Sequence, residues 1–134
     1  MALFRRSHIH TLNDPVFGAI QFERGFWASL PNAREGWSVI IEAPPSGPSD
    51  EQRAFFRFLK EQLQEIREKV TAFIKEQTGA PQSVHTLQVY AIEVGNDEDC
   101  RAKRFAMELA DAHAETIHRV RFEHGEPQEY SCDD

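Results

Sequence analysis

The sequence predicts a single α+β domain in which an antiparallel sheet of about six strands carries one long amphipathic helix on one face. Three observations lead to this fold class. Short stretches of alternating polar and apolar residues fill both ends of the chain, bounded by Gly, Pro, Asn or Asp. A segment with a helical period of apolar residues lies between them. The length of 134 residues, 40% of them hydrophobic and 28% charged, suits one globular domain.

Residues 1–43 are expected to form a meander of short strands. The turn signals Asp14-Pro15 and Arg24-Gly25 separate the first three strands, and such short loops favour antiparallel neighbours. In the stretch 37–42, the apolar residues Trp37, Val39 and Ile41 occupy every second position, so their side chains share one face. The expected strands cover residues 3–12, 16–23, 26–30 and 37–42.

The segment 49–78 predicts one long helix. Ser49 and Gln52 match a capping box, in which each side chain accepts a hydrogen bond from the other residue's backbone amide. Gly79 suits a left-handed C-terminal cap. At 1.5 Å per residue the helix would extend ~45 Å, more than a small domain spans. We therefore expect either a kink or break in the helix, or an end that projects and packs on a partner. One arc of this helix carries the apolar residues Phe55, Phe56, Leu59, Leu63, Ile66, Val70, Phe73 and Ile74.

Residues 84–131 are expected to form a second group of strands. The stretch 96–99 is polar and is expected to be a loop. The stretch 104–110 is ambiguous, because its residue types favour a helix while its apolar side chains alternate as in a strand. The clearer strands of this group cover 86–94, 116–123 and 127–131.

The layout of these elements carries a resemblance to known domains. It combines the turn 14–18, the aromatic pair Phe26-Trp27, a strand that ends before a capped helix, and the closing stretch 117–122. This layout resembles small bacterial domains of unknown function, some of which occur among candidate immunity proteins of polymorphic toxin systems. The resemblance favours a strand over 104–110 and implies a protein that binds a partner. It implies no catalytic residue.

The charge balance restricts the partners. With 22 acidic and 15 basic residues, the net charge is −7, and the basic residues are interleaved with acidic ones. Such a surface repels phosphate groups, so we expect neither nucleic-acid nor membrane binding. The sequence has no signal peptide and no apolar run of ~20 residues, and a cytoplasmic location is expected. Cys100 and Cys132 form no Cys-x-x-Cys pair and are expected to be reduced thiols.

Motifs that carry chemistry are scarce in this sequence. It contains no Gly-x-Ser-x-Gly elbow, no glycine-rich phosphate loop and no dinucleotide fingerprint, so no cofactor is expected. His8 and His10 would share one strand face, and His118 and His124 another. Two such pairs form a metal site only if their strands are neighbours, and no Cys cluster supports one. We therefore expect no metal and name no catalytic residue.

Two functions remain open at this stage. The first is a binding or interaction protein, of immunity type, that takes a basic protein partner. The alternative is a small enzyme or ligand-binding domain that uses histidines and carboxylates in a cleft beside the sheet. The tryptophans are interpreted first as core residues, with the alternative that one of them anchors a partner. Self-association as a homodimer is also expected, because the helix outruns the domain. The candidate binding residues are Trp27, Trp37, Asp97, Asp99, His118 and His124.

Overall fold

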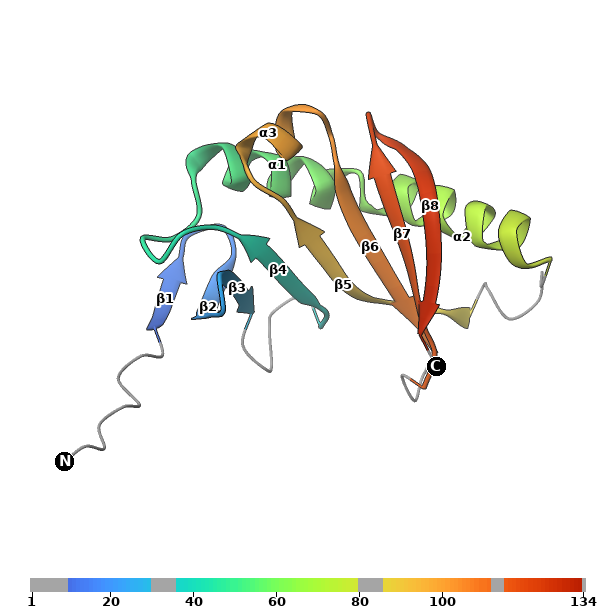
Figure 1. Ribbon diagram of the computed structural model, residues 1–134, viewed down its shortest axis with the longest axis horizontal. Helices are drawn as coiled ribbons and strands as arrows, with labels where there is room; N and C mark the ends of the chain where they lie inside the picture. The colour runs from blue at the N-terminus through green and yellow to red at the C-terminus, as the bar shows by residue number, and fades with distance from the viewer. Residues whose placement is uncertain (1–9, 30–35, 80–85, 112–114, 134) are drawn as a thin grey trace.

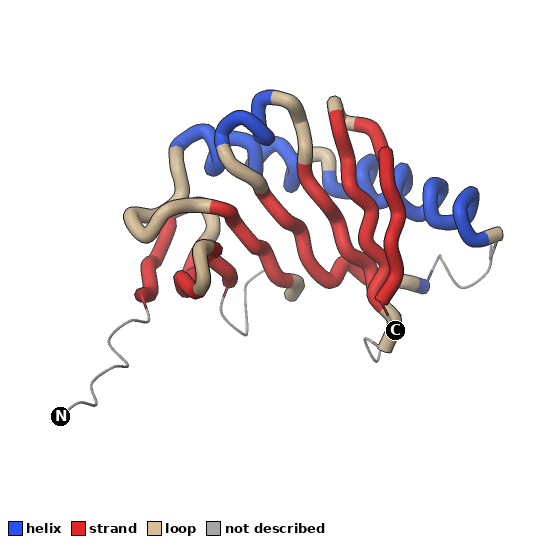
Figure 2. The backbone as a smooth tube through the Cα atoms, in the orientation of Figure 1, coloured by secondary structure: helices blue, strands red, loops and turns tan. Residues whose placement is uncertain are grey.

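The structure, a computed structural model, describes residues 10–29, 36–79, 86–111 and 115–133. It is an α+β fold in which helices cover one face of an open sheet (Figures 1 and 2). The predicted fold class is confirmed, but the sheet has eight strands and not about six. The expected strand over 3–12 is described only from His10, because residues 1–9 lie outside the described part of the chain.

The strands lie side by side in the order in which they occur in the chain. Every neighbouring pair is antiparallel except the fourth and fifth strands, which are parallel and need a long crossover connection. The uncertain stretch 104–110 is a strand, as the resemblance favoured. The strands are β1 (His10–Asp14), β2 (Gly18–Glu23), β3 (Phe26–Ser29), β4 (Ser38–Glu42), β5 (Gln88–Val94), β6 (Phe105–Ala110), β7 (Ile117–Glu123) and β8 (Glu126–Asp133).

The crossover from β4 to β5 is made by two helices, α1 (Asp50–Glu61) and α2 (Leu63–Thr78). The capping box of Ser49 and Gln52 forms as predicted, and Gly79 ends α2 in the left-handed conformation with φ 69°. The predicted long helix is broken at Gln62, which confirms the expectation of a kink or a break. The C-terminal end of α2 also reaches beyond β8 (Figure 1). Because the break at Gln62 already accommodates part of the length of the predicted helix, that length gives less reason to expect a homodimer.

The core lies between the helices and the sheet. The predicted apolar arc of the helices supplies six buried side chains, while Leu63 and Phe73 are half-buried. Alternate residues of the strands point toward this arc, as the period of a strand requires. Burying one large aliphatic or aromatic side chain contributes about 1.5–3 kcal/mol, so this layer is the main source of stability. The largest fully buried side chains include Ile20, Trp27, Ile41, Phe56, Leu59, Ile92, Met107 and Phe122.

The prediction of a loop over 96–99 is wrong in one respect. Asn96 caps a short helix, α3 (Asp97–Arg101), and forms a second capping box with Asp99. This pattern is present in the sequence, since an Asn followed three residues later by an acidic residue can satisfy two backbone amides. Cys100 points into the core from this helix and anchors it.

Gln52 has a second role that its capping motif does not reveal. Its side-chain nitrogen donates to the backbone oxygens of Glu42 and Gly95, each at 2.7 Å. These two residues lie at the adjacent ends of the parallel strands β4 and β5. The buried Gln52 side chain therefore fastens the start of α1 to the place where the two strands meet. Among the described residues, no helix is long and apolar enough to cross a membrane.

Candidate interaction face on the open sheet

One face of the sheet is covered by α1 and α2, and no described element covers the other (Figure 2). We call this second surface the open face. The strand register aligns side chains of five strands across it, one from each of β3 to β7. A hollow of about 320 Å³ lies over these strands. The aligned residues are Ala28, Ile40, Glu93, Ala106 and Arg121.

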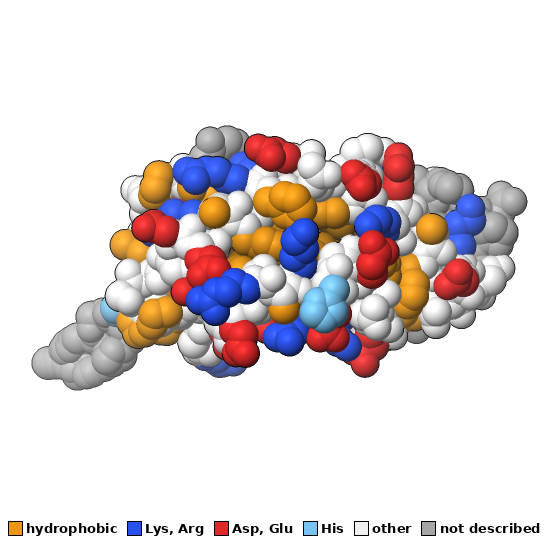
Figure 3. Space-filling model, turned by 90° about the horizontal axis from the view of Figure 1, so that it is seen from above, with side chains coloured by type: hydrophobic (Ala, Val, Ile, Leu, Met, Phe, Trp, Pro, Cys, Tyr) orange, Lys and Arg blue, Asp and Glu red, His pale blue; other side chains and the backbone are white. Residues whose placement is uncertain are grey.

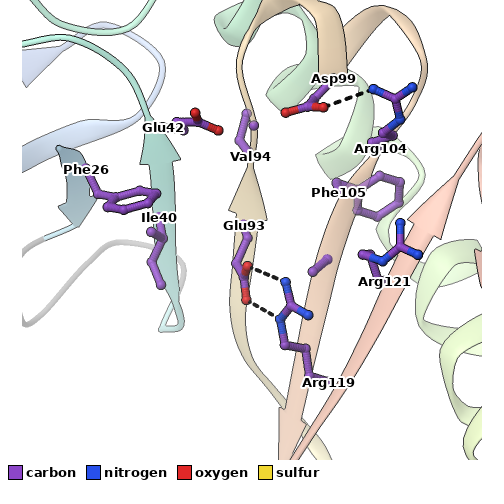
Figure 4. Close-up of a pocket in the computed structure, with 12 residues that line it drawn as sticks. Phe26, Ile40, Glu42, Glu93, Val94, Asp99, Arg104, Phe105, Arg119 and Arg121 are labelled. Carbon is purple, nitrogen blue, oxygen red and sulfur yellow. Dashed lines mark hydrogen bonds and ion pairs between the residues drawn. The ribbon is translucent and has the colours of Figure 1, made fainter. Parts of the chain in front are cut away.

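Phe26 and Ile40 form the apolar side of this hollow (Figure 4). Phe26 is 48% exposed, the most exposed of the large hydrophobic residues that the structure describes. It also borders a second hollow of about 610 Å³ over β2 and β3, so its ring stands between two depressions. An exposed aromatic ring set among polar residues is a common feature of contact sites.

Ion pairs form the other side of the hollow. Arg119 reaches from β7 across β6 and donates from two nitrogens to the two Glu93 oxygens on β5, each at 2.8 Å (Figure 4). Arg104 contacts Glu123 at 2.9 Å and Asp99 at 3.2 Å. These fork-shaped contacts hold the guanidinium groups in fixed directions.

A third arginine is also paired, through a single contact. Arg121 pairs with Glu129 on β8 at 3.1 Å. Each arginine lining the hollow is thus already neutralised by a carboxylate.

Glu108 differs from the other carboxyl groups of the open face. Its partial burial, together with hydrogen bonding to Glu93 and repulsion from it, raises the pKa of Glu108 to about 7. The hydrogen bonds from Arg119 lower the pKa of Glu93 and outweigh its burial. Within this carboxyl pair, the environment therefore favours the ionised form of Glu93 and the protonated form of Glu108.

The open face carries an excess of negative charge. The carboxyl groups in and around the hollow outnumber its three arginines, and Glu42 makes no ion pair with a described residue. Such a surface attracts cationic groups and repels anionic ones. The acidic residues concerned are Glu42, Glu93, Asp99, Glu108, Glu123 and Glu129.

The two tryptophans do not lie on the open face. Trp27 is fully buried in the core, and its Nε1 donates to the backbone oxygen of Pro44 at 2.8 Å. Trp37 is half-buried and packs edge-on against Phe56 of α1, on the helix side. The interpretation of Trp27 as a core residue is confirmed, and as folded it is not accessible to a partner.

The four polar candidates are also dispersed. Asp99 lines the hollow through its pair with Arg104, whereas Asp97 accepts a hydrogen bond from Ser49 at 2.5 Å. His118 lies on the covered side, with Nδ1 2.8 Å from the Tyr130 hydroxyl. His124 lies in the turn between β7 and β8. Only Asp99 among the six candidates therefore belongs to the open hollow.

The histidine pairs of the sequence do not assemble in the described residues. His10 lies on β1 near Phe22, at the far edge of the sheet from His118. His8, His85 and His113 lie outside the described residues. Across residues 10–29, 36–79, 86–111 and 115–133, no group of three or more His, Cys, Asp or Glu is placed to hold a metal ion.

The two cysteines differ in accessibility. Burial and the negative charge of Asp97 raise the pKa of Cys100 to about 12, so this residue remains a thiol. The sequence predicts this direction, because acidic residues surround Cys100 along the chain. Cys132 is exposed on β8.

Sequence reasoning did not select Glu93, Glu108 or Arg119. They occupy polar positions in alternating strands, which is a visible signal. Their convergence depends on the register of strands that are distant in the chain, and that register cannot be read from local patterns. No family model, curated protein or solved structure matches this chain.

Proposed function

We propose that this protein is a binding protein of immunity type, whose open face receives a basic protein partner. The observation that carries the proposal is the exposed Phe26 ring beside Ile40, set among an excess of carboxyl groups on the face that no helix covers. The acidic net charge of the chain, −7, points to the same class of partner.

The arrangement has the anatomy of a protein interface. Apolar anchors in the middle of such interfaces supply most of the affinity, and polar groups around them exclude water and set specificity. Phe26 and Ile40 would be the anchors, while the carboxylate of Glu42, which makes no ion pair with a described residue, would attract cationic side chains. Electrostatic attraction of this kind mainly raises the association rate and weakens as salt is added.

The partner can be trapped with a photo-reactive phenylalanine analogue. We would incorporate benzoylphenylalanine at position 26 and, as a matched control, at position 58. Phe58 is 38% exposed but lies on α1, on the other side of the sheet. Irradiation in cells of the source organism should cross-link a basic protein to position 26 and not to position 58. An acidic adduct, an adduct only at position 58, or no adduct would contradict the proposal.

Binding to the trapped protein then tests the anchor directly. Phe26→Ala should weaken the affinity by about tenfold or more, the effect typical of a central aromatic anchor. Phe58→Ala should leave it unchanged. The association rate should fall several-fold between low and physiological salt while dissociation changes less. Equal affinity of the Phe26→Ala variant and wild type would contradict an open-face interface.

A second candidate function rests on a different observation. The carboxyl pair of Glu93 and Glu108, one ionised and one titrating at about pH 7, is suited to proton transfer at neutral pH. The alternative of a small enzyme or ligand-binding domain that uses histidines and carboxylates therefore retains its carboxylates. The described histidines do not line the hollow. Turnover in a hydrolase and isomerase substrate panel that disappears in Glu108→Gln would favour this function. Turnover unaffected by that substitution would exclude the pair.

A further inference from the structure

A separate pocket lies between the break of the long helix and the turn that joins β7 to β8. Its volume is about 190 Å³, and it shares only Phe105 with the hollow of the open face. Phe58, Ile66 and Phe105 give it an apolar floor, and charged side chains stand at its rim. Figure 3 shows the molecule from the end where α3 and this turn lie. On the surface seen from this side, hydrophobic side chains lie next to basic and histidine side chains.

Lys103 lines this pocket from an unusual backbone conformation. It follows α3 with φ 53°, in the left-handed region that favours glycine. The amide of the next residue, Arg104, donates to the Asp99 oxygen at 2.8 Å, and the Lys103 amide donates to Cys100 at 3.1 Å. This is the hydrogen-bond pattern of a helix end at which glycine normally stands. A residue other than glycine is uncommon at such a position.

The neighbouring turn fixes Lys103 in place. The amide of His124 donates to the Ala102 oxygen at 2.9 Å, and that of Gly125 to the Lys103 oxygen at 3.3 Å. His124 and Gly125 both have positive φ, as a two-residue hairpin turn of type I′ requires. The end of α3 and the hairpin turn are thus joined through their backbones, so Lys103 and His124 stand together at the rim.

The charges of the rim are unequally compensated. Lys69 is neutralised by Glu126 at 2.9 Å. The Lys103 ammonium lies 5.3 Å from the centre of the Phe58 ring and makes no ion pair with a carboxylate in the part of the chain that the structure describes. Glu65 lines the helix side of the same pocket. Among the described residues that line this pocket, Lys103 thus presents an ammonium that contacts an aromatic ring but no carboxylate, and Glu65 supplies a carboxylate that repels additional negative charge.

We propose that this pocket binds a small organic monocarboxylate, with its carboxylate on the Lys103 ammonium and its apolar body against Ile66 and Phe105, beside the Phe58 ring that the ammonium covers. An ammonium held above an apolar floor favours an anion that carries a hydrophobic group. Glu65 disfavours a second carboxylate on the ligand. The site is independent of the partner surface proposed above, because Lys103 and Phe58 do not line the open hollow.

Phenylacetate is a suitable probe, because its single carboxylate and one ring match these groups. In titrations of the full chain followed by amide NMR, it should shift the signals of Lys103 and Gly125 at millimolar concentrations. The neutral isostere phenylacetamide should bind about tenfold more weakly, and phenylmalonate, with its second carboxylate, should bind no more tightly than phenylacetate. Absence of shifts with phenylacetate, or equal binding of phenylacetamide, would overturn the proposal.

Lys103→Gly separates binding from folding. It removes the ammonium and places the preferred residue in the left-handed position, so the melting temperature should stay the same or rise. Phenylacetate affinity should fall by about tenfold, whereas Lys103→Arg, which keeps the charge, should retain most of it. Unchanged phenylacetate affinity in Lys103→Gly would show that Lys103 is not the carboxylate-binding group.

Discussion

The two faces of the sheet are built from neighbouring residues of the same strands but are held by different interactions. On β5 and β6, Ile92 and Met107 are fully buried against the helices, whereas the adjacent Glu93 and Glu108 point to the open face. Burial of apolar area stabilises the face that packs against the helices. The open face instead holds part-buried ion pairs that stay in contact with solvent. Ion pairs at a solvated surface contribute only about 0–1 kcal/mol each. The comparison shows that stability resides on one face, which leaves the other available for recognition.

The strongest test of this comparison uses one residue type on both faces. Ile92→Ala should lower the free energy of unfolding by about 2–5 kcal/mol, because it opens a cavity in the buried layer. Ile40→Ala, on the adjacent strand but facing outward, should cost clearly less, below about 1.5 kcal/mol. Urea denaturation of both variants provides the measurement. Equal losses would mean that the open face also carries the fold.

Gln52 sharpens the comparison at the edge of the buried layer. Gln52→Ala leaves the backbone oxygens of Glu42 and Gly95 without their donor and removes half of the capping box. We expect a loss of about 1–3 kcal/mol in the free energy of unfolding. Gln64→Ala, on the exposed surface of α2, is the control and should cost less than about 0.5 kcal/mol. A neutral Gln52→Ala would contradict a structural role for these bonds.

Glu108 gives the open face a pH dependence of its own. Its pKa in the folded protein, about 7, lies above the ordinary value of 4.5, so the folded state binds this proton more tightly than the unfolded state. That stabilisation is complete below about pH 4.5 and is lost as the pH rises through about 7. With allowance for solvent screening, the loss should be roughly 1–2 kcal/mol.

The measurement is the unfolding free energy of wild type and Glu108→Gln at several pH values. The wild type should lose stability relative to the variant between about pH 5 and pH 7.5. Parallel curves for the two proteins would show that Glu108 titrates normally. The lowered pKa of Glu93 has the opposite effect on stability. The ionised Glu93 stabilises the folded state, and this stabilisation is lost only at low pH, when the carboxylate becomes protonated.

The smallest effect on stability is expected at the exposed pair of Arg121 and Glu129. Arg121→Gln should change the free energy of unfolding by less than about 0.5 kcal/mol, because both side chains are well exposed. The same substitution makes the open face more acidic, so association with a basic partner should become faster at low salt. A slower association would indicate that the partner presents negative charge to this part of the face.

Local signals in the sequence predicted the elements that local interactions determine. Ser49, Gln52 and Gly79 mark the helix ends correctly because a cap involves residues within one turn. The same rule applied to Asn96 and Asp99 would have identified α3. The open hollow could not be predicted, because Phe26, Glu93 and Arg119 meet only through the pairing of distant strands. Residue type alone favours tryptophan as an anchor, whereas the exposure of Phe26 depends on which face of the sheet it occupies.

The parallel pairing of β4 with β5 has a consequence for how the chain folds. Strands β1 to β4 and strands β5 to β8 are two antiparallel groups of sequence neighbours, and they join the same sheet only along this one parallel pair. Contacts between sequence neighbours form quickly, while closing a long loop costs entropy before any contact compensates it. We therefore expect the two groups to form first and the junction under Gln52 to close last. Gln52→Ala should then accelerate unfolding and leave the folding rate nearly unchanged, which stopped-flow chevron plots would reveal.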